Sequence, residues 1–141
     1  MFDFPEIAYQ RQLIVASLDD FTPNATLSHV HGGQYGPNVQ LWKNSVVNFL
    51  WINVRCGLLE GTHRKDISER KDSDFLKEIL INGDPTIGLD AEILWNALYF
   101  NSTEKLDEML DKFQLRDWGA LGFETNQLFI SELKVLYGSV G

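Results

Sequence analysis

The chain has 141 residues, of which 44% are hydrophobic and 23% charged, the proportions of a globular protein and not of a disordered one. One domain of this length, residues 1–141, buries a continuous core without disulfides or a structural metal. The net charge of −8 disfavours nucleic acid and anionic lipid as partners, whereas it favours a basic protein through electrostatic steering. The alternative explanation of the charge is solubility alone.

The cysteine content and the N-terminal stretch predict the compartment. Cys56 is the only cysteine, so the chain forms no internal disulfide and suits the reducing cytoplasm. The opening residues, MFDFPEIAYQRQL, lack the basic and apolar regions of a signal peptide. The most apolar long segment, residues 39–59, contains Lys43, Arg55 and three asparagines and is too polar to span a membrane. We therefore expect a cytoplasmic protein.

The first half of the chain predicts a helix, a loop and a second helix. A helix is expected from Pro5 to about residue 17, with Asp3 as a candidate cap. Residues 19–37, DDFTPNATLSHVHGGQYGP, are typical of a long loop, and they contain a short stretch at 25–31 that suits an extended conformation.

A long, largely buried helix is expected over residues 39–59, with Asn38 as the cap and Gly57 or Gly61 as the exit. Two residues break its apolar pattern. Asn53 falls on the apolar face, where its amide needs hydrogen-bond partners, and Trp51 falls on the polar face with Arg55.

The second half predicts further helices. After a charged connector at 63–74, a short amphipathic helix at 75–80 is followed by a turn at 82–85. A second buried helix is expected at 89–100. The segment 101–115 has the clearest amphipathic pattern, and its Asn101 with Glu104 resembles a capping box. A last helix over 126–137 is expected to end at Gly138. The pattern predicts an all-α bundle of five or six helices around 39–59. The alternative is an α+β fold that uses residues 25–31.

Few residues suggest catalysis or metal binding. His29 and His31 would need a third ligand, such as Asp19, Asp20 or His63, and two loop histidines without a metal are the simpler interpretation. Cys56 lies in an apolar helix, where a thiol behaves as a small hydrophobic group. Arg55 and His63 are too loosely spaced to match a helical ribonuclease. We predict no metal, no cofactor and no enzymatic activity.

An acidic helix face is the main candidate for a binding site. Glu104, Asp107, Glu108 and Asp111 crowd one side of segment 101–115 as like-charged pairs four residues apart, each costing about 0.2–0.5 kcal/mol. Such a face is either simply solvated or contacts a basic partner. We add Trp51 and Arg55 as further candidate partner-binding residues.

Three stretches carry a resemblance to a known class of proteins. WINVRCGLLEG at 51–61, EILWNALYF at 92–100 and STEKLDEMLDKF at 102–113 together resemble the small helical immunity proteins of bacterial contact-dependent inhibition systems. The resemblance implies a cytoplasmic bacterial antitoxin that binds and neutralises a basic toxin, such as a nuclease. It assigns no role to individual residues. A helical adaptor or regulatory domain is the alternative, and an enzyme without a recognisable motif is the third hypothesis.

Overall fold

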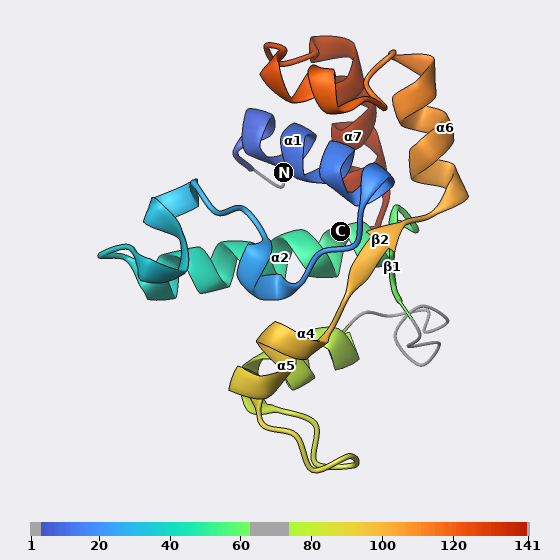
Figure 1. Ribbon diagram of the computed structural model, residues 1–141. Coiled ribbons are helices and arrows are strands. Elements are labelled where there is room, and N and C mark those ends of the chain that lie inside the picture. The colour runs from blue at the N-terminus through green and yellow to red at the C-terminus, as the bar shows by residue number, and fades with distance from the viewer. Residues whose placement is uncertain (1–3, 63–73, 141) are drawn as a thin grey trace.

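The fold is mostly helical, which confirms the predicted class. The computed structural model describes residues 4–62 and 74–140. Figure 1 shows α1, α6 and α7 on one side of α2, and α4 with α5 on the other. The elements of the described residues, in chain order, are α1 (Glu6–Leu18), the 3-10 helices η1 (Pro23–Ala25) and η2 (Val30–Tyr35), α2 (Val39–Arg55), β1 (Leu59–Gly61), α4 (Asp74–Asn82), α5 (Ala91–Ala97), β2 (Phe100–Ser102), α6 (Glu104–Lys112), the 3-10 helix η3 (Trp118–Gly122) and α7 (Gln127–Val140).

Helix α2 forms the centre of the core, as predicted. Its side chains Trp42 and Phe49 are fully buried, and the helix packs against both α4 and α7. Asn53 is also fully buried. Its Oδ1 accepts a hydrogen bond of 2.7 Å from the Tyr137 hydroxyl, and its Nδ2 donates to the Phe49 carbonyl at 2.8 Å. The polar side chain on the apolar face is therefore fully accommodated.

The predicted range to residue 59 is too long, because α2 ends at Arg55, but the chain leaves the helix at Gly57, one of the two glycines predicted as its exit. Gly57 has φ +78°, and its N–H donates to the Val54 carbonyl while that of Leu58 donates to Asn53. This pair of bonds is a Schellman motif, which ends a helix at a glycine in the left-handed conformation. Leu59 then begins β1. The predicted side-chain cap at Asn38 is also wrong, because that side chain makes no capping bond.

The predicted buried helix over 89–100 is too long and only partly buried, since α5 ends at Ala97 and only its Leu94 and Trp95 side chains are buried. The following residues extend and form β2, which pairs antiparallel with β1 and places Phe100 opposite Gly61. Phe100 also forms a bridge with Phe21 and is fully buried. Backbone hydrogen bonds to two distant segments replace those that a longer helix would have made.

The extended stretch expected at 25–31 is absent, and this region instead forms 3-10 turns. The N–H of Leu27, whose φ is +50°, donates to the Gln12 side chain at 2.9 Å. The indole of Trp42 donates to the Thr26 carbonyl at 3.0 Å. These contacts fold the loop onto α1 and α2.

The remaining helices differ from prediction mainly at their ends. The connector 63–74 and Asp3 lie outside the described residues, except that Asp74 begins α4. Helix α4 ends as predicted before the turn at Gly83, whose φ is +87°. Gly138 does not end α7, which continues to Val140.

Among the described residues, no helix has the length and apolar character needed to cross a membrane.

Candidate partner-binding surface

Helix α6 is held firmly at its N-terminus, but its cap is not the predicted one. Asn101 lies in β2, and the cap is Thr103, whose side chain accepts a hydrogen bond from the Leu106 N–H at 3.4 Å. The Thr103 hydroxyl donates to the Gly57 carbonyl at 2.6 Å, and Lys105 Nζ donates to the Cys56 carbonyl at 2.7 Å. These bonds join α6 to the end of α2.

The predicted acidic face of α6 divides into two parts. Arg116 lies 3.4 Å from Asp107 and 3.2 Å from Asp111, so two of the four carboxylates have a cationic partner. Asp107 also accepts a hydrogen bond of 2.5 Å from Ser102. The sequence prediction missed Arg116, because it follows the helix. The chain reverses at Gln114, whose φ is +58°, and brings the guanidinium back to α6.

Glu104 and Glu108 form the unneutralised part of this face. Both are exposed, and neither has an ion-pair partner among residues 4–62 and 74–140. They lie one helical turn apart, where like charges repel. We call these two residues the acidic edge.

A groove between α6 and α7 adjoins the acidic edge. It has a volume of about 470 Å³. Glu108 belongs to both features, and Val135 in the groove is 73% exposed. An ion pair between Lys112 and Glu132 links the two helices. The residues lining the groove are Lys105, Glu108, Met109, Lys112, Glu132, Val135 and Leu136. This surface therefore combines apolar contact area with the Glu108 carboxylate, which has no ion-pair partner in the described part of the chain.

The sequence prediction missed the contribution of α7 to this surface. Its apolar pattern marked the buried side of that helix, whereas Val135 is on the exposed side. An isolated exposed valine carries no recognisable signal until the neighbouring helix is in place.

Trp51 and Arg55, the other predicted partner-binding residues, contact α4 and the end of α7. The half-buried Trp51 donates from its indole to Asp74 at 3.2 Å, and Lys77 Nζ lies 4.0 Å from its ring centroid. Arg55 lies 5.5 Å from the same ring and donates to the Val140 carbonyl at 2.8 Å. Both side chains have intramolecular partners, and the structure does not place them in the groove between α6 and α7.

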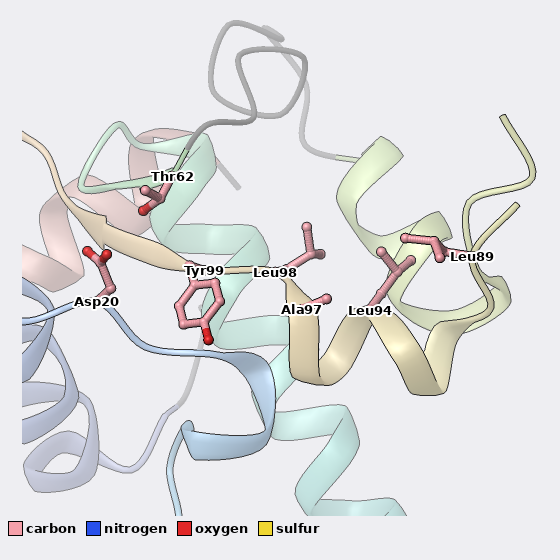
Figure 2. A pocket seen from close by; sticks show the side chains of 7 residues that line it. All are labelled: Asp20, Thr62, Leu89, Leu94, Ala97, Leu98 and Tyr99. Atoms are coloured by element: carbon pink, nitrogen blue, oxygen red, sulfur yellow. The ribbon is translucent and has the colours of Figure 1, made fainter. Parts of the chain in front are cut away.

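A second hollow, of about 430 Å³, lies beside the connection between α5 and β2. Figure 2 shows that its polar groups do not converge, because the Asp20 carboxylate and the Tyr99 hydroxyl point away from each other. The third polar side chain is Thr62, and the other lining residues are aliphatic. The hollow therefore does not bring two titratable side chains together as a cooperating acid–base pair.

The residues considered for metal binding or nucleophilic catalysis are not assembled into a site. His29 and His31 are exposed, His63 lies outside the described residues, and no three His, Cys, Asp or Glu side chains among residues 4–62 and 74–140 gather as metal ligands would. Burial raises the pKa of the Cys56 thiol to about 11. The thiol is therefore protonated at neutral pH, where only a thiolate would be reactive.

Comparison of this chain with protein-family models, curated proteins and solved structures finds no match. The resemblance to immunity proteins thus stays a prediction, and arguments about function rest on the surface of α6 and α7.

Proposed function

We propose that this protein is a cytoplasmic neutralising protein of the immunity or antitoxin class, which binds a basic toxin domain through α6. The observation that carries the proposal is the acidic edge, Glu104 and Glu108, exposed beside the groove between α6 and α7. The repulsion between these carboxylates costs about 0.2–0.5 kcal/mol. A lysine or arginine from a partner would remove this cost and add attraction.

The groove between α6 and α7 supplies the apolar contact area that the surface charges do not provide. Surface ion pairs contribute about 0–1 kcal/mol each, so a tight complex also needs buried apolar contacts. Val135 and the Met109 and Leu136 side chains offer such contacts next to Glu108. The partner segment that fits this surface presents an aliphatic side chain flanked by basic residues.

A nuclease toxin has the required chemistry. Its substrate is a polyanion, so its substrate-binding face is basic. An acidic protein that covers this face competes directly with the nucleic acid. The net charge of −8 accelerates association with such a face through long-range steering.

Affinity capture from the native cells tests the proposal. Three baits are compared: wild type, the double variant E104K/E108K, and the control E78K/E124K, which makes the same change in charge at exposed positions outside the groove. We expect wild type and the control to capture the same basic partner. The amount captured by E104K/E108K should be at least tenfold lower. Expression of that partner alone should stop cell growth, and co-expression of wild type should restore it.

Two outcomes would contradict the proposal. A partner captured equally by all three baits would place the interface elsewhere. A partner that depends on the acidic edge but has no effect on growth would indicate the adaptor alternative.

A further inference from the structure

A second groove lies away from α6, where the start of α2 meets η2, η1, α4 and α5. Figure 1 shows this part of the molecule and α6 at separate ends. The groove has a volume of about 450 Å³, within the range of about 300–1,000 Å³ found for ligand sites. Its unusual feature is a concentration of side-chain amides contributed by four different elements, η1, η2, α2 and α5: Asn24, Gln34, Gln40, Asn44 and Asn96.

The floor of the groove is apolar and has no free hydrogen-bond donor of its own. It is formed by Trp42 and Trp95, which are 0% and 5% exposed. The Trp42 indole donates to the Thr26 carbonyl at 3.0 Å, and the Trp95 indole donates to the Leu80 carbonyl at 2.9 Å. Hydrogen bonds to a ligand must therefore come from the side chains of the groove walls.

The amides in the walls retain unused donors and acceptors. Gln40 Nε2 donates to Asn44 Oδ1 at 3.1 Å, and Asn24 Nδ2 donates to Asn96 Oδ1 at 2.6 Å. Each side-chain amide has one carbonyl acceptor and two N–H donors. Within the described part of the chain, Gln40 Oε1, Asn24 Oδ1 and the Asn44 amino group have no hydrogen-bond partner. Asn96 Nδ2 also donates to the Glu92 carbonyl at 3.5 Å. The residues lining both walls therefore carry neutral polar groups with remaining capacity for hydrogen bonds.

Neutral donors and acceptors on two walls match the backbone of an extended polypeptide. An extended chain presents N–H and C=O groups along both edges and directs successive side chains to opposite faces. Ile81 and Val39 at the margin are 63% and 38% exposed and would contact aliphatic side chains. Lys43 and Glu92 also line the groove and would discriminate between charged ones.

Other classes of ligand fit less well. Nucleic-acid bases and sugar rings bind by stacking on exposed aromatic faces, but both tryptophans of the floor are covered. The net charge of −8 also repels a phosphate backbone. We propose that this groove binds an extended polypeptide segment, with Gln40, Asn44, Asn24 and Asn96 hydrogen-bonding to its backbone. This site is separate from the acidic edge and does not depend on the function proposed for α6.

The test uses a phage-displayed library of random nine-residue peptides, selected on the wild-type protein. The most enriched peptide is synthesised with both ends blocked, and its affinity is measured by titration calorimetry. The test variant is N44A/N96A, and the matched control is N48A, an exposed asparagine of α2 outside the groove. Circular dichroism and melting temperature establish that each variant is folded.

We expect at least a tenfold loss of affinity with N44A/N96A and no change with N48A or E104K/E108K. N-methylation of a central peptide bond in the ligand should weaken binding by a similar factor, because it removes a backbone donor. The proposal is overturned if no peptide is enriched, if N44A/N96A binds the peptide as well as wild type does, or if E104K/E108K abolishes binding. It is also overturned if the N-methylated peptide binds normally, since only side chains would then be recognised. Binding on a glycan array without any enriched peptide would assign the groove to carbohydrate.

Discussion

The hydrogen bond between Tyr137 and Asn53 provides a sensitive test of the core. Tyr137 is 1% exposed and Asn53 is 0% exposed, and 2.7 Å separates the hydroxyl from Asn53 Oδ1. Tyr137→Phe leaves the ring contacts with Phe4 and Tyr9 but deprives the buried Asn53 oxygen of its partner. An orphaned buried acceptor costs about 1–3 kcal/mol, so we expect a loss of about 2 kcal/mol in unfolding free energy.

A double-mutant cycle separates the contribution of this hydrogen bond to the unfolding free energy from the other effects of each substitution. Asn53→Ala also leaves a small cavity and removes the acceptor that the Tyr137 hydroxyl uses on Asn53, and should cost about 2–4 kcal/mol. The double variant lacks both groups of this hydrogen bond, so it should be about 1–2 kcal/mol more stable than the sum of the single losses predicts. Urea unfolding at pH 7 measures the unfolding free energies of the two single variants and the double variant.

The exposed Tyr99, which is 47% accessible, supplies the control. Tyr99→Phe should change stability by less than about 0.5 kcal/mol. If Tyr137→Phe behaves like Tyr99→Phe, or if the cycle is additive, the buried bond does not stabilise the fold and the reasoning is refuted.

Three further predictions concern pH, a helix cap and Trp51. Burial raises the pKa of Cys56 to about 11 and raises the pKa of the Tyr9 and Tyr137 hydroxyls. The unfolded chain therefore releases these protons first. Stability should fall above about pH 8.5 because of Cys56, and above about pH 10 also because of the two tyrosines, each group contributing up to about 1.4 kcal/mol per pH unit until its folded-state pKa is reached. Cys56→Ala should make the decline between pH 9 and pH 10 shallower, and an unchanged slope would contradict the assigned cause. Thr103→Ala should cost about 1 kcal/mol in urea unfolding, whereas Thr103→Ser should restore most of it; equal stability of both variants would disprove the cap. Trp51→Ala should cost about 1–3 kcal/mol, less than the 3–5 kcal/mol typical of a fully buried tryptophan, because the side chain is half-buried against α4. A larger loss would show that this position belongs to the core.

Local periodicity was sufficient to predict where most of the α-helices lie and which face of α6 is buried. In α6 the side chains Leu106, Met109 and Leu110 are buried, as their spacing of three and four residues indicates. The fully buried Asn53 was correctly expected to need partners, although the sequence could not identify Tyr137, which lies 84 residues away.

Features that depend on distant segments could not be predicted. The apolar run at 89–100 is compatible with either a helix or a strand, and the choice at Phe100 depends on backbone pairing with Phe21 and Gly61. The division of the acidic face depends on Arg116, which returns to α6 only because the chain reverses at Gln114.

The two grooves could not be predicted either, because distant segments of the chain form each of them. Helix α7 supplies Val135 to one of them, and separate elements supply Asn24, Asn44 and Asn96 to the other. Each residue is unremarkable in its own segment, and the binding surface exists only after the helices have packed.

The central claim is that Glu104 and Glu108 guide a basic partner onto α6, and the association rate constant measures this most directly. Stopped-flow association of the captured partner is followed at 50 mM and 500 mM salt for wild type, E104K/E108K and E78K/E124K. Steering charges act mainly on association and are screened by salt. We expect E104K/E108K to associate at least tenfold more slowly than E78K/E124K at 50 mM salt, and the difference to shrink severalfold at 500 mM. Equal association rate constants for the two variants at 50 mM salt would contradict the claim.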